Sequence, residues 1–291
     1  MSKIIDGKLV AASVKTRIAE EVATLKSKGI TVSLAVILIG DNAASQVYVK
    51  NKKKVCEELG ISSRQFILSE TIGQEGLLEL IKNLNEDPSV NGILCQLPLP
   101  EGYDEKAVIE AIDPAKDVDS FHPVNVGRIM IGDYTFLPCT PAGIMEMLAY
   151  YNIDITGKEC VVVGRSNIVG KPMSMLLLHK NGTVTTAHSK TNDLAEVCRK
   201  ADILVAAVGK PGFITADMVK EGAVVVDVGI NRVDGKLYGD VDFENVSRKT
   251  SWITPVPGGV GPMTIAMLMQ NTLTAAMYQN NLVPDIRGNK I

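Results

Sequence analysis

Short, uninterrupted apolar runs are the feature that most constrains the fold of this chain. One run covers residues 32–40 (VSLAVILIG), and a shorter one, at 160–163, ends in Gly164. Apolar runs of this length without polar alternation are typical of parallel strands that are buried on both faces. Because parallel strands need crossover connections, helices are expected between them. The runs therefore predict an α/β fold with parallel sheets.

Between the apolar runs, apolar residues recur at the spacing of a helix. The first predicted helix carries apolar residues three or four positions apart, at Val14, Ile18, Val22 and Leu25. Further helices are predicted at 45–59 and around 77–84, with strands at 64–68 and 91–100. Alternation of this kind is the signature of a parallel α/β sheet.

The second half of the chain repeats the alternation. Its predicted strands cover 160–163, 183–187, 202–208 and 223–228. Thr140-Pro141 predicts a helix start with Thr140 as N-cap, and Asp234-Gly235 predicts a hairpin turn.

At 291 residues, the chain has the length of about two domains. We expect a first domain of residues 1–138 that is completed by a C-terminal helix within 263–291. A second, Rossmann-type domain would cover 139–262, and an active-site cleft is expected between the two. The acidic stretch 113–123 lacks an apolar period, and a linker is its simplest interpretation.

Composition excludes several classes of function. The net charge of −3 argues against non-specific nucleic-acid binding, which draws its affinity from a basic face. Five cysteines without a C-x-x-C pair indicate reduced thiols, and the three histidines show no metal-ligand spacing. We expect no membrane association, because the sequence has neither an apolar signal core nor a membrane-length apolar run. A cytoplasmic location is the default expectation.

The stretch 160–172 (CVVVGRSNIVGKP) predicts a strand, a glycine turn and a helix N-terminus. Such a corner binds a pyrophosphate through backbone N–H groups and the helix dipole. The match to G-x-G-x-x-G is imperfect, because Ser166 replaces the middle glycine and Gly170 comes one residue late. The alternative is an ordinary turn between a strand and a helix.

The choice of dinucleotide is indicated by the second strand of this unit. An acid near its end usually binds the ribose 2′-hydroxyl of NAD. Here His188, Ser189 and Lys190 follow the strand, and Arg165 lies in the first loop. Cationic and hydroxyl groups suit a 2′-phosphate, so the sequence favours NADP.

Candidate chemistry lies in the first half of the chain. Tyr48 and Lys52 are four residues apart on the predicted helix 45–59 and therefore share a face. Gln96 ends another strand, and Asp119 lies in the acidic loop, so both are candidates for the same crevice. A solvated basic face is the alternative for the lysine. Short-chain dehydrogenases also use Tyr-x-x-x-Lys, but there the pair follows the glycine loop, whereas here it precedes the loop by more than a hundred residues.

Seven segments in a fixed order carry a resemblance: GDNAASQVYVKNKKK, QLPLP, KDVDSFHP, VVVGRSNIVGKP, AHSKT, DVGIN and PVPGGVGPMT. Together they resemble the bifunctional methylenetetrahydrofolate dehydrogenase/cyclohydrolase family over nearly the whole chain. Two positions depart from that pattern, with Ser120 in place of the usual glycine and Ala43 where proline is common. A different NADP-linked dehydrogenase and a non-catalytic NADP-binding module are the competing interpretations.

The resemblance implies a set of site residues. Catalysis is assigned to Tyr48, Lys52, Gln96 and Asp119. The folate substrate is expected to contact these four together with Cys95, Leu97, Pro257, Gly258, Gly259, Val260 and Gly261. NADP is expected to contact Gly164, Arg165, Ser166, Gly170, Ser189 and Ile230. The resemblance also implies a homodimer that pairs through the second domain and its hairpin near 232–241.

The implied reaction has two steps. Hydride leaves the methylene bridge of 5,10-methylenetetrahydrofolate for NADP, and water then converts the methenyl product to 10-formyltetrahydrofolate. For the second step we expect Lys52 to act as the base, with a pKa lowered by partial burial and by the cationic substrate. Gln96 would position the lysine, Tyr48 would orient the folate ring, and Asp119 would accept hydrogen bonds from the pterin.

Overall fold

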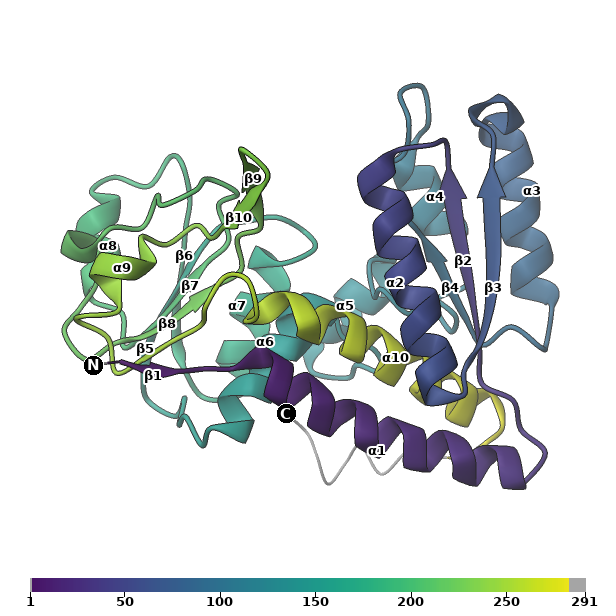
Figure 1. Ribbon diagram of the computed structural model, residues 1–291, viewed down its shortest axis with the longest axis horizontal. Helices are drawn as coiled ribbons and strands as arrows, with labels where there is room; N and C mark the ends of the chain where they lie inside the picture. The colour runs from purple at the N-terminus through teal and green to yellow at the C-terminus, as the bar shows by residue number, and fades with distance from the viewer. Residues whose placement is uncertain (1, 283–291) are drawn as a thin grey trace. The chain divides into compact units, whose positions relative to one another are not determined.

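The structure, a computed structural model, describes residues 2–282, and at positions 43 and 44 the backbone alone. Within this range the chain forms two compact units, each drawn with its own sheet in Figure 1. Unit 1 comprises residues 2–13 and 138–267, and unit 2 comprises 14–137 and 268–282. Residues 283–291, expected to continue the C-terminal helix, lie outside the described range. Among the described residues, no helix is both long and apolar enough to cross a bilayer.

Unit 2 is built on three parallel strands in the order β3-β2-β4. Its strands are β2 (Ser33–Ile39), β3 (Ser62–Leu68) and β4 (Gly92–Cys95). Its helical segments are α2 (Ala43–Leu59), η1 (Glu70–Ile72), α3 (Gly73–Glu86), α4 (Glu105–Ala111) and α5 (Pro123–Ile131). Every residue of β2 and β4 is buried, as their continuous apolar sequences predict.

The two faces of the β2 strand pack against different helices. Ala35, Ile37 and Ile39 lie in a buried cluster with residues of α3 and α4, including Leu77 and Val108. Helix α2 packs against β2 and β3 (Figure 1). The small sheet is therefore sandwiched between helices, and its strand ends are the places left for ligands.

Unit 1 is built on a six-stranded parallel sheet in the order β1-β11-β8-β7-β5-β6. Its strands are β1 (Lys3–Ile4), β5 (Glu159–Val163), β6 (Thr183–Ala187), β7 (Ile203–Ala206), β8 (Val224–Asp227) and β11 (Trp252–Ile253). Its remaining short elements are α6 (Cys139–Tyr150), α7 (Gly170–His179), α8 (Leu194–Arg199), η2 (Ala216–Met218) and α9 (Phe243–Val246). All four strands predicted in this half are confirmed.

A separate antiparallel hairpin leaves the sheet after β8. It pairs β9 (Asn231–Val233) with β10 (Lys236–Tyr238). Asp234 and Gly235 at its tip both have positive φ, of 48° and 78°, as a two-residue turn of this kind requires. The hairpin predicted from Asp234-Gly235 is therefore confirmed.

Two long helices pass from one unit to the other along the chain. They are α1 (Gly7–Ser27) and α10 (Val260–Gln279). Residues 1–13 were expected in the first domain, yet the described part of this segment belongs to unit 1, because β1 pairs with β11. Helix α10 was expected to begin near Met263 but begins at Val260.

Two local expectations from the sequence are wrong, and two short helices were missed. The N-cap of α6 is Pro138 rather than Thr140, whose hydroxyl lies 3.1 Å from that of Thr264. The short helices α4 and α5 were not predicted. The stretch 113–123 is also no linker, because Asp117 forms a parallel bridge with Ile93 of β4.

Candidate active site

Helix α2 holds the predicted catalytic lysine. The helix begins where the Asn42 side chain accepts a hydrogen bond from the Ser45 N–H (3.0 Å), and it ends at Gly60 with φ of 75°. Tyr48 and Lys52 lie one turn apart on this helix, and the Tyr48 side chain is exposed while Lys52 is half-buried. Both are therefore held on a rigid element close to the end of β2.

Lys52 and Gln96 come together although 44 positions separate them in the sequence. The Lys52 Nζ donates a hydrogen bond to the Gln96 Oε1 at 2.8 Å. Gln96 is itself fixed, since its backbone N–H donates to the Ile37 carbonyl (2.9 Å) and its Nε2 donates to the Leu97 carbonyl (2.7 Å). The glutamine that binds Lys52 is thus fixed to the sheet.

The topology explains why this pair lies at a ligand-binding position. The chain leaves β2 for β3 on one side and later returns to β4 on the other side of β2. Open α/β sheets bind ligands beyond the carboxyl ends of their strands, where the strand order reverses. Gln96 follows β4 directly, and Lys52 belongs to the helix that follows β2. The pair therefore lies at the reversal point of unit 2.

Cys95 is the last residue of β4 and is buried. Burial raises the pKa of its thiol to about 12, and the negative charge of Asp119 acts in the same direction. A thiol with this pKa is protonated at neutral pH and is therefore no nucleophile. The role predicted for Cys95, contact with the substrate, needs no nucleophile and stays a prediction.

Asp119 lies in a segment that is held firmly on both sides. Lys116, Asp117, Val118 and Ser120 around it are buried, and Asp119 itself is half-buried. The Asp117 carboxylate accepts hydrogen bonds from the His122 N–H and the Asn125 Nδ2, both at 2.9 Å. Burial raises the pKa of Asp117, and these hydrogen bonds oppose that shift. The segment runs beside β4, whose end carries Gln96.

Ser120, which departs from the glycine of the resembling family, has φ of 60°. This left-handed conformation is one that glycine adopts without cost and serine does not. The serine side chain is fully buried, and its Oγ donates to the Phe136 carbonyl at 3.2 Å. The departure therefore exchanges backbone freedom for a buried hydrogen bond directly beside Asp119.

The glycine corner lies at the carboxyl end of β5. Gly164 has φ of 142°, and a side chain there would clash with the Ala207 carbonyl at the end of β7. A side chain at Gly170 would likewise clash with the backbone of Gly164. Strand β5 lies between β6 and β7, so the corner occupies the point where the strand order of unit 1 reverses.

Ser166 organises the turn that leads into α7. Its Oγ accepts hydrogen bonds from the Val169 N–H (3.2 Å) and the Gly170 N–H (3.3 Å). Arg165 beside it is exposed. The predicted middle-glycine position is thus occupied by a serine whose hydroxyl accepts from the N-cap residue Val169 and from the first N–H of α7. A tight turn, a helix N-terminus and an exposed cation are features that fit a dinucleotide phosphate.

The other predicted cofactor residues follow neighbouring strands. Ser189 is exposed two residues after β6, in a turn closed by the Thr191 Oγ1, which accepts from the His188 N–H at 2.8 Å. Ile230 is exposed three residues after β8. Residues 257–259 lie between β11 and α10, and Val260 and Gly261 form the first turn of α10. These residues belong to unit 1, as do Gly164 and Arg165.

Two buried aspartates at this edge of unit 1 were not identified from the sequence. Asp227 ends β8, and Asp240 follows the hairpin. Burial raises the pKa of Asp227 to about 6, although three backbone N–H groups donate to its carboxylate. The available signal was DVGIN, in which an acid at a strand end precedes a glycine.

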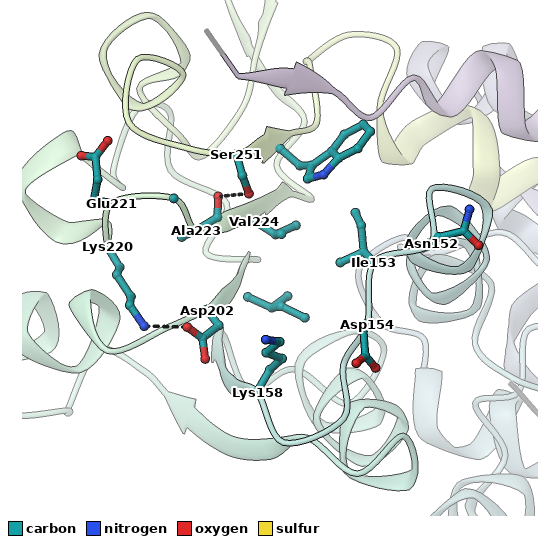
Figure 2. A pocket seen from close by; sticks show the side chains of 13 residues that line it. Asn152, Ile153, Asp154, Lys158, Asp202, Lys220, Glu221, Ala223, Val224 and Ser251 are labelled. Carbon is teal, nitrogen blue, oxygen red and sulfur yellow. Dashed lines mark hydrogen bonds and ion pairs between the residues drawn. The ribbon is translucent and has the colours of Figure 1, made fainter.

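A cavity of about 310 Å³ lies at the opposite edge of the same sheet (Figure 2). It is lined by residues at the amino ends of the strands, including Lys158 before β5, Asp202 before β7 and Trp252 at the start of β11. Asp202 is already paired, since its carboxylate binds the Lys220 Nζ at 2.6 Å and accepts from the Glu159 N–H at 3.0 Å. Because ligands of parallel sheets bind at the carboxyl ends of strands, this cavity is not the candidate active site.

Family models cover both parts of the chain. Residues 5–119 match the catalytic domain of tetrahydrofolate dehydrogenase/cyclohydrolase, and residues 138–280 match its NAD(P)-binding domain. The bifunctional protein FolD of Acetivibrio thermocellus is 61% identical over 279 residues, which are 96% of this chain and 98% of that protein. The FolD of Moorella thermoacetica is 59% identical, over 94% of this chain and 99% of that protein.

Solved structures of similar enzymes superpose closely. The FolD methylenetetrahydrofolate dehydrogenase/cyclohydrolase of Campylobacter jejuni has a TM-score of 0.94 and 54% identity, over 96% of this chain and 99% of that chain. The enzyme of Trypanosoma brucei, solved with NADP and an inhibitor, has a TM-score of 0.91 and 39% identity, over 95% and 98% of the two chains. Both likenesses cover at least 95% of this chain.

Proposed function

The chain belongs to the tetrahydrofolate dehydrogenase/cyclohydrolase family, and from that premise we propose how its own residues perform the two reactions. It is a bifunctional enzyme of folate one-carbon metabolism that uses NADP. It oxidises 5,10-methylenetetrahydrofolate to the methenyl form and hydrolyses that product to 10-formyltetrahydrofolate. The observation on which the residue assignment rests is the 2.8 Å contact between the Lys52 Nζ and the Gln96 Oε1 at the reversal point of unit 2.

The cofactor is assigned to the glycine corner of unit 1. The Gly164 turn and the N-terminus of α7 would receive the pyrophosphate, and Arg165 with Ser189 would bind the 2′-phosphate. Ser166, Gly170 and Ile230 complete this predicted set. When bound, NADP supplies the hydride acceptor for the methylene carbon. The protein contributes by holding both reactants still, which lowers the entropic cost of the reaction.

The folate is assigned to the residues around Lys52. Tyr48 would orient the ring from one turn earlier on α2, and Asp119 would accept hydrogen bonds from the amino and ring N–H groups of the pterin. Cys95 and Leu97 would contact the substrate beside Gln96. The glycine-rich stretch 257–261 is assigned to the substrate as well, because glycines without side chains let the substrate approach the backbone closely.

Hydrolysis needs a base, and we assign that role to Lys52. A cationic methenyl group beside the lysine disfavours the ammonium form, so the neutral amine can take a proton from the attacking water. The hydroxyl adds to the methenyl carbon, the bond from that carbon to N5 breaks, and Lys52 returns the proton to N5. The adduct's own O–H proton leaves for solvent as the formyl C=O forms. Gln96 holds the amine in place throughout.

One assay tests the proposed function. Protein is mixed with NADP and 5,10-methylenetetrahydrofolate, and the absorbances of NADPH and of the methenyl product are followed in time. We expect NADPH to form and the methenyl signal to decay into 10-formyltetrahydrofolate, with slower turnover when NAD replaces NADP. Absence of turnover with either cofactor would leave a non-catalytic binding module as the better interpretation.

We further propose that two chains form a homodimer through unit 1. Its hairpin exposes Val233 and Tyr238, and Ile230 precedes it, so apolar side chains are available on this surface. Sedimentation at micromolar concentration should give the mass of a dimer, and a monomer would contradict the proposal. A cytoplasmic location is also proposed, because all five cysteines are free and buried, as a reducing compartment allows.

A further inference from the structure

The loop that follows β7, residues 207–212, forms a second wall beside the glycine corner. Strands β5 and β7 are neighbours, and the strand order reverses between them. The Ala207 carbonyl packs so closely on Gly164 that a side chain at Gly164 would clash with it. The position of this loop therefore sets the shape of the corner assigned to NADP.

The loop is held by a buried carboxylate instead of by another strand. The Asp240 Oδ2 accepts hydrogen bonds from the N–H groups of Val208 (2.7 Å) and Gly209 (2.9 Å). Its Oδ1 accepts from the Lys210 N–H (2.9 Å) and from the Asn231 Nδ2 (2.9 Å). Three consecutive amides thus point at one anion, a charge-assisted arrangement that is stronger than three neutral contacts.

Asp227 in turn holds the segment that carries Asp240. Its Oδ1 accepts from the N–H groups of Gly229 (2.9 Å) and Asp240 (2.8 Å), and its Oδ2 accepts from the Val241 N–H (2.9 Å). A side chain at Gly229 would clash with the Asp240 carboxylate, and one at Gly239 would clash with that of Asp227. The two aspartates therefore interlock the loops after β7 and β8 with the end of the hairpin.

The burial of Asp240 excludes two more familiar roles for an acid in a dinucleotide-binding unit. Its side chain is fully buried, and both of its oxygens already accept N–H donors. It is therefore not placed to bind a ribose hydroxyl, as the acid of an NAD-binding unit does. It also has no exposed oxygen with which to exchange a proton with a substrate.

We propose that Asp240 is a positioning residue for the cofactor, which sets the affinity for NADP by fixing residues 208–210 against the Gly164 corner without touching NADP. The inference rests on the proposed placement of NADP at that corner. A loop that is already ordered before binding loses little conformational entropy when the ligand binds, so the affinity is higher. Loss of the Asp240 contacts should therefore raise the KM for NADP more than it lowers kcat.

The test compares Asp240→Asn with Asp242→Asn, which removes a carboxylate two residues away whose described contact is to Asn245 (2.7 Å). For Asp240→Asn we expect a KM for NADP about tenfold higher, with the KM for methylenetetrahydrofolate within about twofold of wild type. The cyclohydrolase reaction, assayed without NADP, should keep its rate. Asp242→Asn should behave as wild type in all three measurements.

Hydrogen exchange separates a positioning role from general destabilisation. In Asp240→Asn the peptide that contains 208–210 should exchange faster, while peptides of β5 and β7 keep their protection. An unchanged KM for NADP, or equal losses of both activities, would overturn the proposal. If NADP fails to protect residues 164–170 in the wild type, the placement of the cofactor is wrong. If it protects them and Asp240→Asn binds NADP normally, only the role of Asp240 is wrong.

Discussion

At the residue scale, the role of Lys52 depends on a contact between two segments that the sequence separates. Its Nζ is fixed at 2.8 Å from Gln96, and Tyr48 lies one turn away on the same helix. Lys53 is its neighbour but is exposed and forms a helical ion pair with Glu57 at 3.9 Å. The two lysines thus provide a matched pair, in which the first is assigned to catalysis and the second to a solvated face.

We predict that Lys52→Met lowers cyclohydrolase turnover at least a hundredfold, because general base catalysis contributes about 10²–10⁴ in rate. Methionine has an unbranched side chain one atom shorter than that of lysine, so it keeps most of the apolar stem and removes the amine. Hydrolysis of methenyltetrahydrofolate is measured by its absorbance, and NADP binding is measured by fluorescence as a control for folding. Lys53→Met should keep the wild-type rate. Hydrolysis at the wild-type rate by Lys52→Met would disprove the assignment.

Ser120 leads to a second prediction at this scale. Glycine at this position would relieve a left-handed backbone that costs a non-glycine residue about 1 kcal/mol, but it would lose a buried hydrogen bond of about the same value. Ser120→Gly should therefore change the free energy of unfolding by less than about 1 kcal/mol. Ser120→Ala keeps the strain and loses the bond, so it should destabilise the protein by about 1–2 kcal/mol.

Urea denaturation of the two variants tests this balance. Both variants lose the hydrogen bond to Phe136 and only the Ala variant keeps the backbone strain, so a Gly variant that is less stable than the Ala variant would show that the left-handed backbone at position 120 carries no net cost. The KM for folate of each variant reports separately on Asp119, which lies next to the substituted position.

At the scale of elements, α10 is bound to unit 2 by a polar side chain within an apolar helix. Asn271 is buried, and its Nδ2 donates to the carbonyls of Val118 and Leu137, both at 2.8 Å. These carbonyls flank the segments that contain Asp119 and Phe136. One amide group therefore joins the helix to the segment that precedes Asp119 and to the segment that follows Phe136.

We predict that Asn271→Leu destabilises the protein by about 2–4 kcal/mol, because two buried carbonyls lose their donor. Asn280→Ala is the matched control, since its Nδ2 donates to the Ala276 carbonyl of α10 and the residue is exposed. Its cost should stay below about 1 kcal/mol. The midpoint and slope of urea unfolding measure both values, and equal stabilities of the two variants would contradict this role for Asn271.

Elements with long, regular patterns could be predicted from the sequence, and short ones could not. The apolar runs at β2, β5 and β8 are strands because burial on both faces requires continuous apolar sequence. Helices α4 and α5 are too short for an apolar period to be distinctive, although Pro123 at the first turn of α5 was an available signal. Thr140 was mistaken for an N-cap because a local rule cannot account for a tertiary contact with Thr264.

The candidate site likewise has a part that could be predicted from local sequence and a part that could not. Tyr48 and Lys52 could be paired from spacing alone, because a helix places residues four apart on one face. The contact between Lys52 and Gln96 depends on strand order, which local patterns do not contain, so it could be expected only through the family resemblance. Asp240 could not be found at all, since its partners are backbone N–H groups of a distant loop.

At the scale of the whole molecule, both units place their proposed ligand contacts where the strand order of a parallel sheet reverses, although the two sheets differ in size. In each, the strand order reverses beside a strand whose end carries the proposed ligand contacts, Gln96 in unit 2 and Gly164 in unit 1. Buried carboxylates support the loops near these points, Asp117 in unit 2 and Asp227 in unit 1. Burial raises the pKa of both, so the stability of the molecule is linked to pH through groups that take no part in the chemistry.

The pKa of Asp227 determines whether stability rises or falls with pH, and over which pH range it does so. Its pKa is about 6 in the folded protein and about 3.8 in the unfolded chain, so the folded state binds the proton more tightly. The stabilising contribution is therefore complete below pH 3.8 and is lost as the pH rises through 6. Between pH 7 and pH 5 this group alone should add about 1 kcal/mol to the free energy of unfolding.

The contribution can be isolated by comparison with Asp227→Asn, in which this position does not titrate. Urea unfolding of both proteins is measured at pH 5, 6 and 7, and other titrating groups cancel in the difference. We expect the variant to be less stable throughout, because an amide cannot accept from all three N–H groups that surround the carboxylate. The gap should nevertheless widen by about 1 kcal/mol from pH 7 to pH 5. A gap that narrows as the pH falls would mean that the three N–H donors outweigh burial and hold the pKa of Asp227 below its unfolded value.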